Sequence, residues 1–144
     1  MLGAILAKRE VRKAFDALAR HDADTVLGMF HDDGVFEFPG ETVLGGRFQG
    51  KEAIGAWFER WFERMPVIRF TLNHVSVENI FAMGATNTVH VEWDLEESDN
   101  DGNAYRLTGV TAFHVVGGKA KHIKDYIFDQ NVLRTIWPAG STLA

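Results

Sequence analysis

The sequence predicts a single α+β domain, with helices in its first half and a β-sheet in its second half. Up to residue 65, apolar residues recur at the spacing of amphipathic helices. From residue 67 onward, four long segments rich in β-branched and aromatic residues are separated by polar or glycine-rich turns. Because 144 residues suffice to build one hydrophobic core, we expect one domain over residues 1–144.

Composition narrows the classes of partner and the expected location. A net charge of −5 without a dense run of Lys or Arg argues against a nucleic-acid partner. No stretch approaches the ~18 apolar residues of a membrane helix, and the apolar N-terminal segment precedes Lys8 and Arg9, the reverse of a secretory signal. The lack of cysteine excludes a disulfide framework and fits a reducing compartment. We therefore expect a cytoplasmic protein with no nucleic-acid or membrane partner.

The first half predicts three helices. The first carries Val11, Ala14, Phe15 and Leu18 on one face. The second is short: Asp22 or Asp24 can cap it, and residues 32–34 are expected to end it. After a short strand at 35–38 and a glycine-punctuated loop at 40–50, the third helix is the strongest local prediction. Its apolar stripe comprises Ile54, Trp57, Phe58, Trp61, Phe62 and Met65, and Pro66 marks its end.

The second half predicts a meander of four long antiparallel strands. We expect these strands at residues 67–77, 81–95, 105–116 and 120–128, with the polar run 96–103 as one of the turns. Three helices followed by such a meander favour helices covering one face of a strongly curved, mostly antiparallel sheet. The apolar tail from Val132 to Trp137 is expected to form either a lid or a last packing segment.

A carboxylate lies in the middle of the closing strand. Asp125 is in step with Ile123 and Ile127, so all three share one face of the strand. If that face is buried, Asp125 must be hydrogen-bonded, paired or neutral, and its pKa is raised. If the opposite face is buried, Asp125 simply meets water. The alternation alone leaves both interpretations open.

The strand at 81–95 presents the same ambiguity. His90, Glu92 and Asp94 lie on one face, where they could tune or partner Asp125 as an acid cluster. The opposite face carries Val89, Val91, Trp93 and Leu95. Alternation favours burial of this apolar set, because each such side chain stabilises the fold by ~1.5–3 kcal/mol when buried.

Two local motifs resemble a known superfamily. Residues 46–54, Gly-Arg-Phe-Gln-Gly-Lys-Glu-Ala-Ile, are similar to the start of the third helix in the SnoaL-like branch of the nuclear transport factor 2-like superfamily, and residues 118–129 resemble its closing strand. The resemblance covers nearly the whole chain. It implies a cone-shaped, cystatin-like fold and relatives that include polyketide cyclases, ketosteroid isomerases and limonene epoxide hydrolase. It also implies that the convex face of the sheet pairs with a second subunit through Val91, Trp93 and Phe128.

Limonene epoxide hydrolase offers the most detailed comparison. The resemblance places Asp125 and Asp94 at the positions of its two catalytic aspartates, and Glu92 where that family has a bridging arginine. Phe36 and Phe38 stand on the strand that supplies the family's water-holding tyrosine and asparagine. An arginine lowers the pKa values of two neighbouring carboxyls, whereas a third carboxylate raises at least one of them. These departures argue against epoxide hydrolysis.

We therefore predict a homodimeric domain whose pocket binds a small, largely apolar molecule carrying a carbonyl or hydroxyl group. Acid/base chemistry of the isomerase, cyclase, dehydratase or hydrolase type would depend on Asp125, Asp94, Glu92 and His90, without cofactor or metal. The alternative is a non-catalytic ligand-binding or dimerisation module. The expected pocket walls are Trp57, Phe58, Trp61, Phe36, Phe38, Leu107, Phe113, Ile123 and Ile127.

Overall fold

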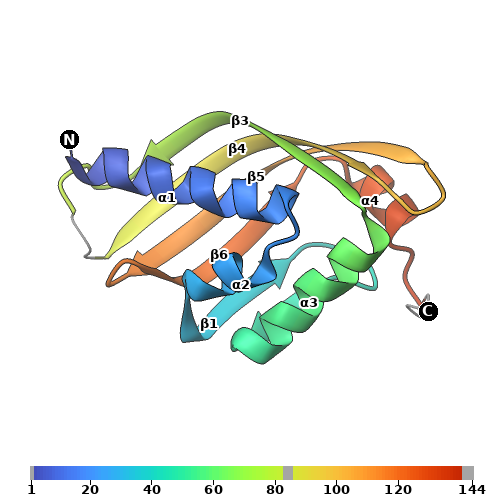
Figure 1. Cartoon of the computed structure of the whole chain (residues 1–144), viewed down its shortest axis with the longest axis horizontal. Coiled ribbons are helices and arrows are strands. Elements are labelled where there is room, and N and C mark those ends of the chain that lie inside the picture. The colour runs from blue at the N-terminus through green and yellow to red at the C-terminus, as the bar shows by residue number, and fades with distance from the viewer. Residues whose placement is uncertain (1, 83–85, 141–144) are drawn as a thin grey trace.

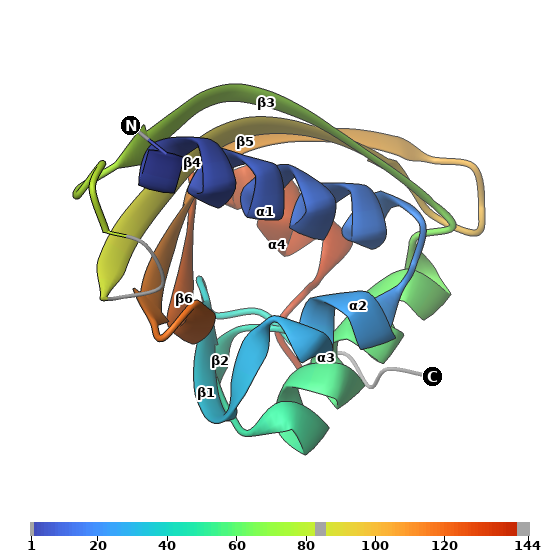
Figure 2. The ribbon, with the colours of Figure 1, turned by 60° about the vertical axis from the view of Figure 1, so that its left-hand side comes forward.

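The protein has an α+β architecture in which helices pack on one curved sheet, as predicted. A computed structural model describes residues 2–82 and 86–140. Figure 1 shows the helices α1 (Leu2–Ala19), α2 (Ala23–Gly28) and α3 (Lys51–Arg64) on one side of the sheet. Figure 2, turned by 60°, shows strands arching over α1, so the helices lie within the concave side of the curve. None of the helices in the described ranges is long and apolar enough to cross a membrane.

The sheet has the strand order β2-β1-β6-β5-β4-β3 within the described residues. Its strands are β1 (Phe30–Phe38), β2 (Gly46–Gln49), β3 (Val67–Val77), β4 (Asn87–Ser98), β5 (Ala104–Val116) and β6 (Lys119–Ile127). The last four form the predicted antiparallel meander. The predicted strand 81–95 begins later, at Asn87, and its residues 83–85 lie outside the described ranges. β1 pairs with β6 in parallel, so the sheet is mostly but not wholly antiparallel.

The boundary between α1 and α2 follows from local hydrogen bonds. His21 adopts a left-handed conformation with φ 57°, and the amide of Asp22 returns to the carbonyl of Ala17 at 2.9 Å, a usual way to end a helix. Asp22 then caps α2, as one of the two predicted alternatives, because its Oδ1 accepts a 3.0 Å hydrogen bond from the amide of Thr25.

The predicted end of the second helix was wrong. α2 ends at Gly28, and residues 30–34 belong to β1 instead. The register between β1 and β6 shifts between Phe30 and Val35, which marks an irregularity where residues 32–34 leave the ladder. Lys121 on β6 contacts Asp33 at 2.5 Å. The Asp-Asp-Gly sequence that indicated a helix stop therefore lies in an irregular part of β1.

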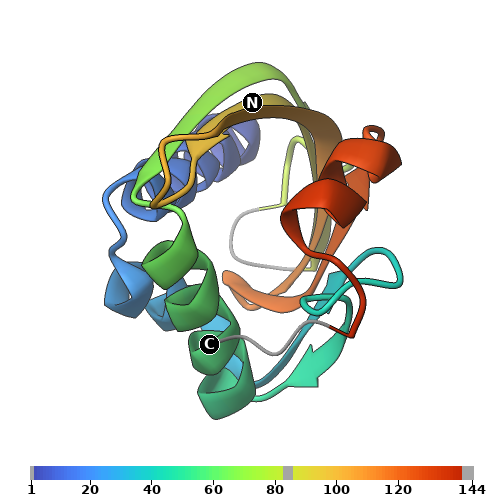
Figure 3. The ribbon, with the colours of Figure 1, turned by 90° about the vertical axis from the view of Figure 1, so that its right-hand side faces the viewer.

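The apolar tail is a packing segment. It forms α4 (Gln130–Ile136), in which Leu133 and Ile136 are fully buried, followed by Trp137, which is 2% exposed. Helix α4 packs against β5 (Figure 3). Of the two alternatives for this tail, lid or packing segment, the burial of its apolar side chains supports the second.

The predicted dimer contacts Val91 and Trp93 were wrong. Both side chains point into the protomer's own core, where they are 0% and 3% exposed. Phe128, the third residue assigned to that face, is 86% exposed. The physical reason is the alternation along β4, because turning this strand the other way would bury its charged residues and expose its apolar ones. A charge introduced at Trp93 would therefore disrupt the core of the protomer.

Candidate functional site

A cavity of ≈ 250 Å³ lies between the concave face of the sheet and the helices. Figure 3, which looks along the long axis, shows the sheet and the helices that enclose it. All the residues predicted to wall a pocket line this cavity. They are Trp57, Phe58, Trp61, Phe36, Phe38, Leu107, Phe113, Ile123 and Ile127. Aromatic rings dominate the wall on the α3 side, where Phe36 meets Trp57 edge to face at a centroid distance of 4.7 Å.

Asp125 faces this cavity. Of the two interpretations left open by the sequence, a buried face or a face in water, the structure supports the first. Ile123 and Ile127, two residues to either side of it on β6, are buried and line the same space. Thr111 on β5 lies directly opposite Asp125, and its Oγ1 donates a 2.5 Å hydrogen bond to Asp125 Oδ1. Trp93 Nε1 in turn donates to Thr111 Oγ1 at 2.9 Å. Two adjacent strands therefore fix the orientation of the carboxyl.

The environment of Asp125 favours its neutral form. The residue as a whole is half-buried, because part of its surface borders the cavity. Protein atoms surround its carboxyl group, and this burial raises the pKa of Asp125 from 3.8 to about 7. The hydrogen bond from Thr111 opposes the shift, because it stabilises the ionised form. The pKa is raised as predicted, but burial causes the shift rather than like charges on β4. Near neutral pH, Asp125 can therefore either accept or donate a proton.

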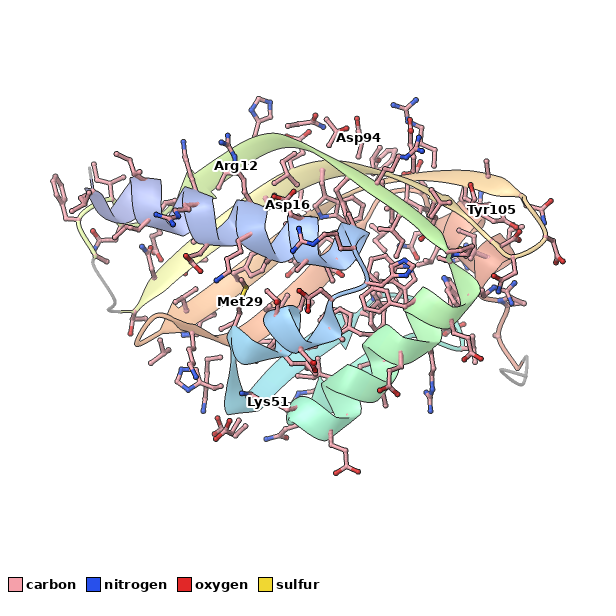
Figure 4. The ribbon with its side chains drawn as sticks, in the orientation of Figure 1. Arg12, Asp16, Met29, Lys51, Asp94 and Tyr105 are labelled. Carbon is pink, nitrogen blue, oxygen red and sulfur yellow. The ribbon has the colours of Figure 1, made fainter. Side chains whose placement is uncertain are left out.

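His90, Glu92 and Asp94 do not join Asp125, so the predicted acid cluster was wrong. His90 and Glu92 are exposed on the outer face of β4, and Figure 4 shows Asp94 on the outside of the sheet. Their neighbours are other surface groups: Arg106 lies 3.9 Å from Asp94, and His74 lies 3.9 Å from Glu92. The inward face carries the apolar set instead, because its burial is favourable and burial of three ionisable groups is costly.

A second cavity carboxyl, Glu97, was not predicted. It is 2% exposed, and its Oε2 accepts a 2.9 Å hydrogen bond from Trp61 Nε1. Burial raises the pKa of Glu97 to about 7, against the opposing effect of the Trp61 hydrogen bond. The prediction ended the strand at residue 95 and placed Glu97 in a polar turn. Continuing the alternation of Trp93 and Leu95 by one step would have found it.

The two carboxyls lie toward opposite ends of the cavity. Glu97 pairs in register with Tyr105 and Asp125 with Thr111, so six residues of β5 separate their levels. At about 3.3 Å per strand residue, this separation is on the order of 20 Å along the strand. The two acids therefore cannot share one proton in the manner of a close carboxyl pair.

The cavity lining contains acids but no bases among the residues that the structure describes. Its polar side chains, apart from the indoles of its tryptophans, are Glu10, Asn87, Glu97, Thr111 and Asp125, and Lys, Arg and His are absent from the set. Glu10 is exposed and belongs to α1, so it marks an open part of the lining. Nowhere in the described ranges do three His, Asp or Glu side chains gather in a way that could hold a metal ion.

Comparisons with known proteins agree with the fold. Residues 11–123 match the SnoaL-like domain family. A search of curated proteins finds no match. Among solved structures, Bal32a from a soil-derived mobile gene cassette is 19% identical, with a TM-score of 0.78 over 94% of this chain and 98% of its own.

Two further structures show the same likeness. A nuclear transport factor 2-like protein of Burkholderia pseudomallei is 18% identical, with a TM-score of 0.76 over 92% of this chain and 97% of its own. A candidate polyketide cyclase of Xanthomonas campestris pv. campestris is 19% identical, with a TM-score of 0.67 over 93% of this chain and 98% of its own. At these identities the likeness shows the nuclear transport factor 2-like fold and no particular activity.

Proposed function

The chain belongs to the SnoaL-like family, and we propose that it binds a small, largely apolar molecule in its cavity and performs acid/base chemistry on it. The observation that carries this proposal is the setting of Asp125, a carboxyl oriented by Thr111 in a largely apolar cavity, with a pKa of about 7. A carboxyl held there only for stability would be unfavourable, because burial of an acid costs more than burial of an apolar side chain.

Asp125 would act as the proton-transfer group. In its ionised form, Asp125 Oδ2 has no hydrogen-bond partner in the described part of the chain and can remove a proton from the carbon next to a substrate carbonyl. The carboxylic acid so formed can return the proton at another atom. The electron pair moves from the broken C–H bond into an enolate and back, so the sequence isomerises the substrate without an external reagent. Cyclisation and dehydration begin with the same proton removal.

The apolar walls would support this step in two ways. They exclude water from Asp125, and this burial raises its pKa to about 7. At neutral pH the carboxylate is therefore a stronger base than an exposed aspartate would be. They also hold a flat apolar substrate against the sheet through the aromatic residues of α3. The candidate polyketide cyclase with the same fold supports chemistry of this class, and we propose no cofactor.

Deuterium exchange tests the proposal directly. 2-Tetralone, a small bicyclic ketone, exchanges the hydrogens next to its carbonyl in D₂O, and NMR follows the loss of their signals. We expect the wild-type protein to accelerate this exchange and Asp125→Asn to abolish the acceleration. Asp94→Asn is the matched control, because Asp94 lies on the outer face of the sheet, and it should exchange as the wild type does.

The alternative, a non-catalytic binding module of the same fold, predicts a different result. In that case 2-tetralone would perturb cavity resonances without faster exchange, and Asp125→Asn would change nothing in the exchange rate. Equal rates for the wild type and Asp125→Asn would therefore overturn the catalytic proposal and leave ligand binding as the function.

We also propose that the protein is a cytoplasmic homodimer. Support for the dimer comes from Tyr126 on the outer face of β6 and from Phe128 directly after that strand, which are 53% and 86% exposed. Val110 on β5 lies in register with Tyr126. Support for the location comes from the absence of cysteine in the sequence.

A further inference from the structure

Glu97 has an oxygen that the protein leaves unused. Trp61 Nε1 donates a hydrogen bond to Glu97 Oε2, and Glu97 Oε1 has no hydrogen-bond partner among the residues that the structure describes. Glu97 is nonetheless only 2% exposed, and it lines the cavity. Among the residues that the structure describes, the fully enclosed side-chain atoms without a partner are His21 Nε2 and Thr42 Oγ1, so Glu97 Oε1 keeps some accessible surface and can accept a hydrogen bond from a molecule in the cavity.

A structural role for Trp61 does not require a carboxyl. One neutral acceptor satisfies an indole N–H, and a backbone carbonyl already does so for Trp57, whose Nε1 donates to Leu44 O at 3.0 Å. Glu97 adds an ionisable group and a second acceptor atom to a position where a neutral acceptor would suffice. The surplus acceptor points to a hydrogen-bond donor on a bound molecule.

The surroundings of Glu97 limit the shape and charge of that molecule. Between the levels of Glu97 and Asp125 the walls are apolar, with Leu107, Trp93 and Phe70 among them. A ligand that meets both carboxyls is therefore elongated and apolar along its body. Lys, Arg and His are absent from the described lining, so a carboxylate or phosphate on the ligand would meet no cationic side chain there and would be repelled by the ionised acids.

We infer that the cavity binds an uncharged, elongated aromatic molecule with a hydroxyl group at one end, which donates a hydrogen bond to Glu97, and a reacting carbonyl at the other, beside Asp125. This inference rests on the proposed function, because it names the substrate class of the same cavity. Glu97 is a binding residue in this scheme and takes no part in proton transfer at the reacting end.

Three biphenyl probes test it by calorimetry at pH 8, above the pKa of Glu97. They are 4-acetylbiphenyl, 4-acetyl-4′-hydroxybiphenyl and 4′-acetylbiphenyl-4-carboxylate. For the wild type, we expect the hydroxylated probe to bind about tenfold or more tightly than 4-acetylbiphenyl, since a hydrogen bond to a charged group has that effect. The carboxylate probe should bind more weakly than 4-acetylbiphenyl.

Substitutions at Glu97 assign the preference to this residue. In Glu97→Met, which keeps the length of the side chain, the hydroxylated probe and 4-acetylbiphenyl should bind equally. Glu97→Gln retains an acceptor and should restore part of the preference. Glu96→Met is the matched control on the exposed face of β4 and should behave as the wild type. Thermal unfolding of each variant confirms that it is folded before binding is compared.

The outcomes separate this inference from the proposed function. Equal binding of the hydroxylated probe and 4-acetylbiphenyl to the wild type, or an unchanged preference in Glu97→Met, would overturn the role of Glu97 while leaving the chemistry of Asp125 intact. A preference that depends on Glu97, with no exchange of 2-tetralone, would uphold the binding role and refute the catalytic one. Failure of the wild type to bind any of the three probes would overturn this inference, and the exchange of 2-tetralone would still decide the proposed function.

Discussion

Thr111 sets the ionisation of the candidate catalytic group, although it carries no charge itself. Its hydroxyl accepts from Trp93 and donates to Asp125, so the single proton of that hydroxyl is committed to the carboxyl. A carboxylate that accepts a hydrogen bond is stabilised relative to the neutral acid. Thr111 therefore keeps the pKa of Asp125 lower than burial alone would set it.

We expect Thr111→Val to raise the pKa of Asp125, because valine preserves the shape of threonine but cannot donate a hydrogen bond. If Asp125 acts as a base, the pH at which 2-tetralone exchange reaches half its maximum should move upward. Thr88→Val, on the outer face of β4, should leave that pH unchanged. An unchanged or lower midpoint in Thr111→Val would show that this hydrogen bond does not govern the ionisation.

At the scale of residues, the sequence predicted one carboxyl of the cavity and missed the other. Asp125 was identifiable because isoleucines two residues to either side marked its face as apolar. Glu97 was not, because it stands in the polar run 96–103, which indicates a turn rather than a strand. Alternation along β4 favoured burial of its apolar residues, as the structure shows, whereas the resemblance to limonene epoxide hydrolase pointed to the wrong face.

At the scale of elements, β4 and β5 approach each other closely where Trp93 crosses Gly109. A Cβ atom at residue 109 would lie 2.7 Å from the Trp93 ring and 2.5 Å from the carbonyl oxygen of Tyr126. Glycine therefore allows the indole to lie across β5, from where its Nε1 reaches Thr111. The hydrogen bonds that connect Trp93 through Thr111 to Asp125 therefore depend on the lack of a side chain at Gly109.

We expect Gly109→Ala to lower the free energy of unfolding by about 1–3 kcal/mol, because neither the backbone of β6 nor the packed indole can yield without strain. Urea unfolding followed by tryptophan fluorescence measures this change. Gly28→Ala is the control: apart from its chain neighbours and the backbone of its own helix, no atom lies within 4 Å of the added carbon, and alanine favours helix α2. Similar stability of both variants would contradict the role assigned to Gly109.

Most elements could be predicted from their periodicity, and the exceptions have specific causes. The stripe of α3 and the strands of the meander follow patterns that nearby residues determine. The start of β1 does not, because Phe30 pairs with Ala120 and this partner lies far away in the sequence. The parallel pairing of β1 with β6 was absent from the prediction for the same reason.

At the scale of the whole molecule, the two buried acids make stability depend on pH. Both pKa values are raised to about 7 in the folded protein, so between their unfolded values near 4 and pH 7 the folded state binds more protons than the unfolded state. Stability from these groups is therefore fully present below pH 4 and is lost as the pH rises through 7. Asp22, Asp33 and Asp99 have lowered pKa values and act in the opposite sense in acid.

We expect the free energy of unfolding to fall between pH 5 and pH 8 by about 2–3 kcal/mol for each buried acid. Asp125→Asn combined with Glu97→Gln should flatten this dependence and be more stable than the wild type at pH 8. Urea unfolding at several pH values provides the measurement. A wild-type protein equally stable at pH 5 and pH 8 would show that neither carboxyl is neutral in the folded state.

The proposed dimer can be tested at its most exposed aromatic residue. Phe128→Glu should convert the protein to a monomer without loss of folding, because Phe128 lies on the outer face and makes little contact with its own core. Analytical ultracentrifugation decides the outcome. Phe81→Glu, in the loop before β4, removes a similarly exposed aromatic, 78% exposed, and should remain dimeric. A wild-type protein that stays monomeric when concentrated would refute the dimer.

The parallel pairing of β1 with β6 also determines when the cavity can form during folding. Phe36 pairs with Ile123, so one wall is complete only after the chain between residues 36 and 123 has closed into a loop. Contacts between such distant residues slow folding, since the entropy of closure is lost before the contacts form. During synthesis on a ribosome, Asp125 emerges after helices α1, α2 and α3 and the first five strands. The acid that we assign to catalysis thus enters its apolar surroundings among the last steps of folding, when most of those surroundings already exist.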